Sequence, residues 1–382
     1  MSKKILCVVL SGIMLLMSFS SVYAKDNVDE MITDGIKYAK ELAGVYDGGF
    51  LAQRHILPVG NTLSDWIAMV FALNGVEDDY ESYLKDLRFY VEDKYEEDGY
   101  LDRIKATEYH RIILTIYALG GDPTSFGEKP DGSSIDLLAD GTYFFHGDSL
   151  GLQGLNGWIF SLISLDAKNT AVPENAKFTR EDMLDAILSA QEADGGFGLS
   201  SGSSNADITA MAVQALAPYK DRSDVSEAIE KALGFMSDIM TDEGRFIAYG
   251  EESSETISQL IIALCSVGID PMEDERFVKG GKNLLQHAES YLCKDGGFSH
   301  SYGHDDSDFM ATQQMLLALT SVKLLREREC RLYDLSEYDS PEIKITDEDA
   351  GSFPTAAVVI FIAAAAIIII GIIVKTRGKK NV

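Results

Sequence analysis

Hydrophobic and polar positions alternate through the middle of the chain in two kinds of helical pattern. In the first kind, apolar residues recur at the i, i+3, i+4, i+7 spacing of one helix face, with charges on the other face. Val225, Ala228 and Ile229 begin one such stripe, opposite Glu227 and Glu230. In the second kind, apolar residues surround the helix, so protein must enclose it. The two patterns predict half-exposed helices and enclosed helices.

The two kinds of helix alternate along the chain, and a half-exposed helix comes first in each pair. Half-exposed helices are predicted at 28–44, 80–95, 133–139, 179–193, 225–240 and 276–292. Enclosed helices are predicted at 62–73, 105–119, 153–165, 205–217, 254–266 and 307–324. Each half-exposed helix is thus followed by an enclosed partner.

Between the two helices of each pair lies a turn of the form Asp-Gly-(Gly)-aromatic or a close variant. The turns begin at Asp47, Asp98, Asp140, Asp194, Glu243 and Asp295. Glycine supplies the backbone freedom of a tight turn, and the aromatic residue can fill the seam between helices. A period of about 50 residues is typical of a helical repeat array. We therefore predict an all-α protein, an α6/α6 toroid of six helical hairpins over residues 25–330, with the enclosed helices inside.

Both ends of the chain carry membrane-related signals. Lys3 and Lys4 precede an apolar run that ends in small residues before Ala24, which predicts a secretory signal peptide at 1–24. A transmembrane helix is predicted at 354–374, because residues 355–374 carry no charge and a basic tail, 375–382, follows. The acidic residues 331–353 are predicted to form a solvated stalk. The toroid would then lie outside the cell, anchored by one helix.

Charge narrows the choice of partners. The chain has a net charge of −28 at neutral pH, whereas nucleic-acid binding requires clustered Lys and Arg. Nucleic acid is therefore excluded as the expected partner. After removal of the signal peptide the cysteines that remain are Cys265, Cys293 and Cys330, whose spacing fits neither a disulfide scaffold nor a metal site.

The turn Gln191-x3-Gly195-x-Phe197 and the other Asp-Gly-Gly-Phe turns resemble the prenyltransferase/squalene-cyclase repeat. With the helix that begins near Asp207, residues 28–325 are most similar to membrane-anchored Gram-positive surface proteins that carry such repeats. The resemblance implies an α6/α6 toroid and a bacterial cell-surface location. Terpene cyclases, protein prenyltransferase β subunits and the cobalamin carriers are more distant members of the same superfamily.

The resemblance raises one enzymatic possibility. Class II terpene cyclases protonate an alkene with the middle acid of Asp-x-Asp-Asp-Thr-Ala, and the corresponding run here is Asn205-Ala-Asp207-Ile-Thr209-Ala. Asp207 would be the general acid, although both neighbouring acids are replaced. In the alternative interpretation Asp207 caps its helix with help from Asn205 or Thr209. The zinc ligands of prenyltransferases have no counterpart, so no metal and no cofactor are predicted.

Binding without catalysis is the function that we predict. Aromatic and polar residues near the predicted starts of the enclosed helices could line a site at one end of the toroid, although seam packing also explains many of them. The candidates are Trp66, His110, Tyr143, His146, Trp158, Asn205, Asp207, Tyr249, Tyr302 and His304. The expected ligand is a small apolar or corrinoid-like molecule, or a surface protein or glycan. An isoprenoid cyclase or transferase using Asp207, and an adhesion or scaffold protein, are the alternatives.

Three structural outcomes separate these functions. An apolar cavity around Asp207 would favour the enzyme. A filled ring with aromatic residues clustered at its mouth would favour binding. A smooth polar end would favour a scaffold.

Overall fold

The computed structural model describes residues 27–45, 49–248, 251–338 and 340–341. The chain divides into a compact unit that ends at Ile343 and a second unit, Lys344–Val382. The predicted signal peptide (1–24), transmembrane helix (354–374) and basic tail (375–382) lie outside the described residues, as does most of the predicted stalk. In the part of the chain that the structure describes, no helix is long and apolar enough to cross a membrane.

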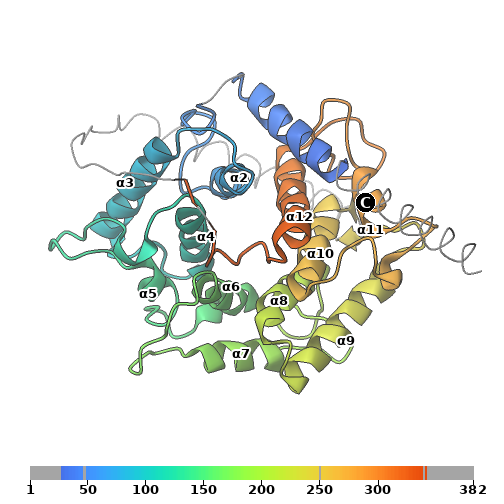
Figure 1. Cartoon of the computed structure of the whole chain (residues 1–382). Helices are drawn as coiled ribbons and strands as arrows, with labels where there is room; N and C mark the ends of the chain where they lie inside the picture. Colours follow the sequence, from blue (N-terminus) through green and yellow to red (C-terminus); the bar gives the residue numbers. More distant parts are fainter. Residues whose placement is uncertain (1–26, 46–48, 249–250, 339, 342–382) are drawn as a thin grey trace, which may run out of the picture. The chain divides into compact units, whose positions relative to one another are not determined.

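Six helices of the first unit form an inner ring (Figure 1). They are α2 (Thr62–Leu73), α4 (Ala106–Ala118), α6 (Leu155–Asp166), α8 (Ala206–Leu216), α10 (Ser254–Val267) and α12 (Phe309–Arg328). Each contacts the next along the chain, and α12 returns to α2. Gln313 on α12 donates to the Thr62 carbonyl (3.3 Å), and Asn74 donates to Thr320 on α12 (2.8 Å), so side chains hold the closure at two levels.

Outside this ring lie the amphipathic helices (Figure 1). They comprise residues 27–42, α3 (Tyr80–Asp98), α5 (Leu137–Gly141), α7 (Arg180–Ser189), α9 (Ser223–Ile239) and α11 (Leu284–Glu289). Short 3-10 helices lie at Pro123–Ser125, Leu150–Leu152, Ala217–Tyr219 and Glu275–Phe277. A two-residue antiparallel pair joins β1 (Ile247–Ala248) and β2 (Glu251–Glu252). The described unit is therefore an α/α toroid, as predicted, with this small strand pair as an addition.

The repeated turns act as seams between neighbouring hairpins. Asp194 accepts hydrogen bonds from the Gly196 N–H (3.0 Å) and the Ser204 hydroxyl (2.7 Å), and Asp295 makes the same pair of contacts in the last repeat. Gly195 has φ +89°, and an added Cβ would lie 2.7 Å from the Lys231 carbonyl oxygen on the next outer helix. The turn chemistry therefore brings each hairpin against its neighbour.

One predicted helix is much shorter than expected. The pattern over 276–292 predicted a continuous outer helix, whereas α11 covers only Leu284–Glu289. Gly280 and Gly281 have positive φ values of 55° and 79°, which an α-helix does not allow. The prediction was wrong for the first half of this segment, because two consecutive glycines outweigh the apolar spacing.

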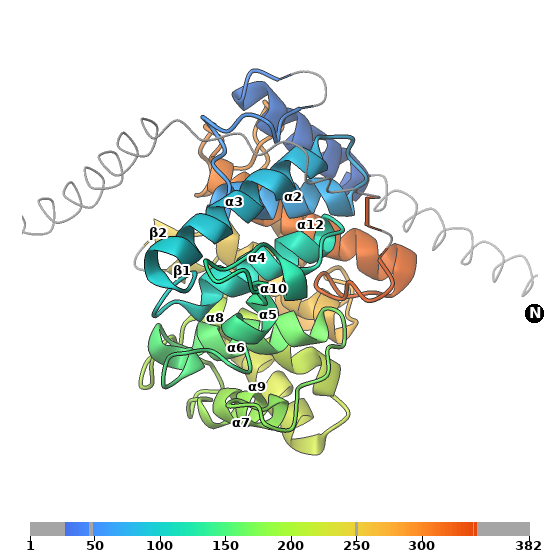
Figure 2. The same cartoon turned by 90° about the vertical axis from the view of Figure 1, so that its left-hand side faces the viewer.

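The inner helices all run in the same direction through the ring. Near their starts, Thr107 on α4 donates to Gln153 just before α6 (2.8 Å), and Thr256 on α10 donates to Asp207 on α8 (2.7 Å). We call the end where they begin the N-terminal end of the ring and the opposite end its C-terminal end. In Figure 2 the β1–β2 pair, which precedes α10, lies at the N-terminal end. The last turn of α12 lies at the C-terminal end.

The chain after α12 turns back into the C-terminal end of the ring. We call residues 330–338 the C-terminal segment. Within it Leu332 (0 % exposed), Tyr333 (9 %) and Leu335 (1 %) are buried. The solvated stalk predicted from residue 331 is therefore corrected for this part: the apolar side chains of Leu332, Tyr333 and Leu335 are covered by the ring, and the toroid unit extends beyond residue 330.

Candidate functional site

Exposed apolar side chains gather at the N-terminal end of the ring. Among the described residues, every large hydrophobic side chain that is exposed, Val278 excepted, lies in or directly beside a connection from an outer helix to the next inner helix. These side chains are Leu42, Ile56, Ile104, Phe144, Leu152, Leu199, Ile239, Ile247, Tyr302 and Met310. Val278 lies in a connection of the opposite kind, before α11. The two ends of the ring therefore differ in their apolar exposure.

Part of this end forms a small platform at the starts of α4, α6 and α8. We define the platform as Tyr100, Ile104, His146, Leu152 and Leu199. The Tyr100 and His146 rings stack with centroids 4.5 Å apart and planes 8° apart. A Cβ on Gly147 would lie 2.6 Å from Leu152, and one on Gly154 would lie 2.5 Å from Leu199. The absence of side chains at these two glycines lets the leucines lie flat on the backbone.

Hydrogen bonds to the backbone hold the platform loop in place. The His146 Nε2 lies 3.0 Å from the Arg103 carbonyl oxygen. Lys177 directs its ammonium group to three consecutive carbonyl oxygens and donates to those of Phe145 (3.2 Å) and Gly147 (2.6 Å). A loop with these restraints needs little further ordering when it binds a partner.

Two predicted site residues support the platform without being part of its surface. Tyr143 is buried, and its carbonyl oxygen accepts from the Lys177 and Phe178 N–H groups. Burial, with the nearby Asp136 carboxylate, raises the pKa of Tyr143 to about 12. The ring of Trp158 meets that of Phe178 edge to face, with centroids 5.5 Å apart. Tyr143, His146 and Trp158 are thus brought together in one sector of the ring.

Asp207 belongs to a polar cluster at the N-terminal end, distinct from the platform. Its carboxylate accepts a hydrogen bond from the Thr256 hydroxyl (2.7 Å) on the neighbouring helix. Burial raises the pKa of Asp207, the Glu255 charge raises it further, and the Thr256 hydrogen bond opposes both. His300 Nδ1 lies 2.8 Å from a Glu255 oxygen. The arrangement holds a carboxyl group that keeps its proton to higher pH than an exposed aspartate.

The sequence allowed an alternative interpretation in which Asp207 caps α8, and the structure shows a different N-cap. Asn205 is the N-cap and accepts from the Ile208 N–H (3.0 Å). The Thr209 hydroxyl instead accepts a hydrogen bond from the N–H of the turn residue Phe197 (2.8 Å). Asp207 is therefore free of the capping role, because its carboxylate points to α10.

Tyr302 and His304 lie in the connection before α12. Tyr302 is exposed, and the Arg245 guanidinium carbon lies 3.8 Å from its ring centroid. Arg245 also pairs with Glu252 (2.7 Å). The His304 side chain is exposed. Tyr249, the remaining candidate of this sector, lies outside the described residues.

Trp66 and His110 lie inside the ring rather than at its mouth. The Trp66 ring contacts the Phe160 ring of α6 and the Tyr333 ring of the C-terminal segment. His110 is fully buried, and its Nε2 lies 2.7 Å from the Gly141 carbonyl oxygen and 3.0 Å from the Ser161 hydroxyl. Burial lowers the pKa of His110 to about 4, so its imidazole is neutral at physiological pH. Both side chains build the ring wall.

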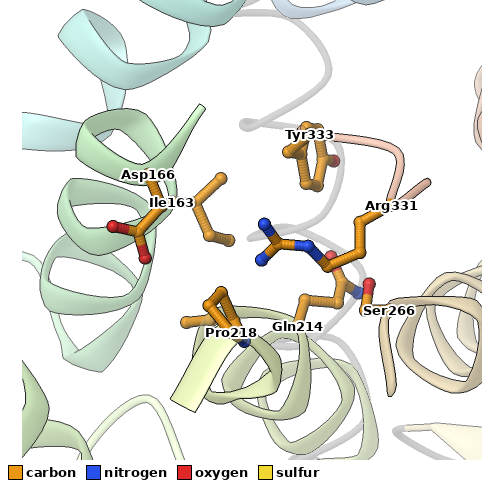
Figure 3. A pocket seen from close by; sticks show the side chains of 8 residues that line it. Ile163, Asp166, Gln214, Pro218, Ser266, Arg331 and Tyr333 are labelled. Atoms are coloured by element: carbon orange, nitrogen blue, oxygen red, sulfur yellow. The ribbon is translucent and has the colours of Figure 1, made fainter. Parts of the chain in front are cut away.

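A small cavity lies at the opposite, C-terminal end (Figure 3). Its walls come from the last turns of α6, α8 and α10 and from Arg331 and Tyr333 of the C-terminal segment. The cavity volume is about 20 Å³, which has room for about one water molecule. It is far smaller than a site for a small-molecule substrate, whose volume is about 300–1,000 Å³.

Several residues of these clusters escaped the sequence prediction. Thr256, Glu255 and His300 come from different repeats than Asp207, and no spacing along the chain connects them. Tyr100 is the aromatic residue of the turn that begins at Asp98, so its position carried a signal that was not used for the site. In the described part of the chain, no group of three His, Cys, Asp or Glu side chains is arranged to hold a metal ion.

No protein-family model matches the chain, and no curated protein matches it in sequence. Among solved structures, a type II terpene cyclase from Scytonema with geranylgeranyl dihydroxybenzoate bound is similar at 12% identity, covering 78% of this chain and 99% of that chain, with a TM-score of 0.48. An apo structure of that cyclase gives 12% identity, 82% and 98% coverage and a TM-score of 0.45.

An unsaturated glucuronyl hydrolase from Bacillus sp. GL1 is similar at 13% identity, covering 71% of this chain and 87% of that chain, with a TM-score of 0.46. Similarity at this level does not by itself establish a shared fold. The class of the protein, an α/α toroid, rests on the helix order and the ring closure described above.

Proposed function

We propose that this protein is a membrane-anchored, cell-surface member of the prenyltransferase/squalene-cyclase repeat proteins and that it binds a ligand or partner, without catalysis, at the N-terminal end of its ring. The observation that carries the proposal is that, among the described residues, the large exposed apolar side chains other than Val278 lie at this end. Apolar surface exposed to water favours association, and a patch of it marks a binding site more often than isolated residues do.

The platform has the properties of a preorganised recognition surface. It combines a stacked aromatic pair with two leucines that lie on glycine backbone, and Lys177 restrains the loop that carries it. Rigid aromatic and aliphatic anchors contribute most of the free energy of many interfaces. A ligand with aromatic or apolar groups, either a small molecule or part of a surface protein or glycan, fits this chemistry.

The interior of the ring supports binding over catalysis. Trp66, Phe160 and Tyr333 come from three different parts of the chain and meet inside the ring, with centroids 6.0 to 6.4 Å apart. This cluster occupies space that a cyclase would need for a long polyprenyl chain.

One observation favours a second candidate function. The raised pKa of Asp207 and its pairing with Thr256 suit a general acid. An isoprenoid cyclase or transferase would require this proton and a substrate path to it. Turnover of squalene or a polyprenyl diphosphate that is lost in Asp207→Asn would support this candidate.

Native mass spectrometry of the full chain, purified from its own host, tests the binding proposal. We expect a copurifying mass in the wild type that is lost in the Leu152→Asp/Leu199→Asp variant. The control is Val278→Asp, which places one such charge at an exposed apolar position of the other end and should retain the mass; each single variant, Leu152→Asp and Leu199→Asp, matches it in charge and should lower the occupancy. Equal occupancy in the platform variant and the control would refute the platform as the site.

A further inference from the structure

The C-terminal end of the ring holds a segment of the chain itself in the manner of a bound peptide. The C-terminal segment follows α12 after Glu329, whose φ of +52° ends the helix in a left-handed turn. From there the chain re-enters the ring and buries Leu332, Tyr333 and Leu335. An acidic connector has no need of such side chains, so this burial requires an explanation.

Tyr333 is the anchor of this segment. Its ring lies 6.0 Å from that of Trp66 on α2 and 6.3 Å from that of Phe160 on α6, both measured between centroids. Because α4 separates α2 from α6 in the ring, Tyr333 reaches into the interior and bridges helices that are not neighbours. Burial raises the pKa of the Tyr333 hydroxyl, in keeping with an enclosed phenol ring.

The remaining polar contacts use carbonyl oxygens at the ends of inner helices. The Leu335 N–H donates to the Ala167 carbonyl oxygen (2.8 Å) after α6, and the Tyr338 hydroxyl donates to that of Ala72 near the end of α2. The last carbonyl groups of a helix have no partner within the helix. In this ring several of these carbonyl groups, such as that of Ala72, accept from the turn that follows the helix. A carbonyl oxygen has a second lone pair, so the C-terminal end of the ring still suits a peptide with N–H and hydroxyl donors.

The segment and the ring fit together incompletely. The cavity of about 20 Å³, room for about one water molecule, lies between Arg331 and Tyr333 on one side and the ends of α6, α8 and α10 on the other (Figure 3). Gln214 points to this region, and its buried Oε1 has no hydrogen-bond partner within the described residues. Protein interiors are close-packed. The gap and the acceptor without a partner therefore mark a place where the segment does not fill the end of the ring completely.

We propose that the C-terminal end of the ring is a peptide-binding site that takes a short extended peptide with a tyrosine anchor and flanking leucines. In this structure the site is filled by the chain's own C-terminal segment. A tethered peptide acts at an effective concentration of about a millimolar, so an identical peptide from outside competes poorly until the tethered copy is weakened. The site is separate from the platform, and either proposal can fail without the other.

Fluorescence anisotropy on the full chain tests the site. The probe is a labelled peptide with the sequence of residues 331–341. We expect Tyr333→Ala/Leu335→Ala to bind it saturably, at least about tenfold more tightly than the wild type does, because tethering no longer fills the site. A peptide carrying the same two alanines should not bind. The control Ile56→Ala/Ile239→Ala, at two exposed positions of the other end outside the platform, should behave as the wild type.

Hydrogen exchange of the wild-type chain gives a second test, which holds even if the double variant does not fold. The Leu335 amide should exchange at least about tenfold faster than amides in the middle of α10, because the segment leaves the ring without global unfolding. Exchange of Leu335 at the same rate as α10 would overturn the proposal, since the segment would then be a permanent part of the fold. So would a folded double variant that does not bind the peptide.

Discussion

The buried ion pair between α2 and α4 allows a quantitative test of how the ring is held together. Arg111 Nε donates to the Asp65 carboxylate (2.8 Å), and the two side chains are 6 % and 0 % exposed. Asp65 also accepts from the Tyr83 hydroxyl (2.6 Å) and the Gly60 N–H (3.1 Å). The pair joins two neighbouring inner helices in a site that water does not reach.

Arg111→Met removes the cation and leaves the Asp65 carboxylate buried. Breaking a buried pair in this way destabilises a protein by about 3–5 kcal/mol. With an unfolding entropy of about 2.1 cal/mol/K per residue over the roughly 310 residues that the structure describes, the expected fall in Tm is about 5–8 °C. In Asp65→Leu/Arg111→Met neither charge remains, so this double variant should be more stable than Arg111→Met alone.

The effect should depend on pH. Burial raises the pKa of Asp65 even in the wild type, against the influence of Arg111 and Tyr83, and removal of Arg111 raises it further. A carboxyl whose pKa is higher in the folded than in the unfolded state binds more protons when folded. Its contribution therefore favours folding at low pH and is lost as pH rises from about 3.9 through the raised value. Arg111→Met should lose less stability at about pH 5 than at about pH 7.

Thermal melting followed by far-UV circular dichroism, with the wild type at each pH as reference, measures these differences. If the single effects of Asp65→Leu and Arg111→Met simply add in the double variant, the two side chains are not coupled and the reasoning fails. A loss for Arg111→Met that is equal at both pH values would show that Asp65 does not carry the uncompensated charge.

Two further predictions concern the turns and the ring wall. Gly296→Ala should destabilise the protein by more than about 1 kcal/mol, because φ is +87° and the new Cβ would lie 2.8 Å from the Asp34 carbonyl oxygen. The control is Gly202→Ala, because Gly202 has φ +90° but open space around it, so this variant has the backbone strain without the clash. Chemical denaturation should show a smaller loss of stability for Gly202→Ala than for Gly296→Ala. Equal losses of stability would exclude the clash as a cause. Since burial lowers the pKa of His110 to about 4, the unfolded state binds more protons below about pH 6.5, and stability should fall by up to about 3 kcal/mol between pH 6.5 and 4. His110→Gln should reduce this dependence of stability on pH. If the slope of stability against pH is the same in this variant, other titratable groups cause the pH dependence.

The sequence predicted the ring closely because its signals are local. The spacing of apolar residues within a single helix and the glycines of each turn identify the hairpins without reference to the rest of the chain. The inner helix α2 begins and ends where the pattern over 62–73 predicted. The prediction failed at 276–292, where two glycines interrupt an apolar pattern, and at residue 331, where a polar composition concealed three buried apolar side chains.

The candidate site was predictable only in outline. His146, Tyr302 and His304 are exposed in the connections at the N-terminal end, whereas Trp66 and His110 are enclosed in the wall. An aromatic residue near the start of an inner helix can face the mouth or the seam, and the sequence pattern is the same in both cases. The rotation of each helix within the closed ring decides between them.

The sequence by itself determined the helices, their pairing into hairpins and the ring that six such pairs form, because these features depend on periodicity and turn chemistry within each repeat. Only the tertiary structure decided which side chains meet. Asp207 finds Thr256 at a separation of 49 residues, and Tyr338 finds the Ala72 carbonyl at a separation of 266. Such contacts arise when the ring closes, since closure brings the last helix beside the first and the ends of all inner helices to one face.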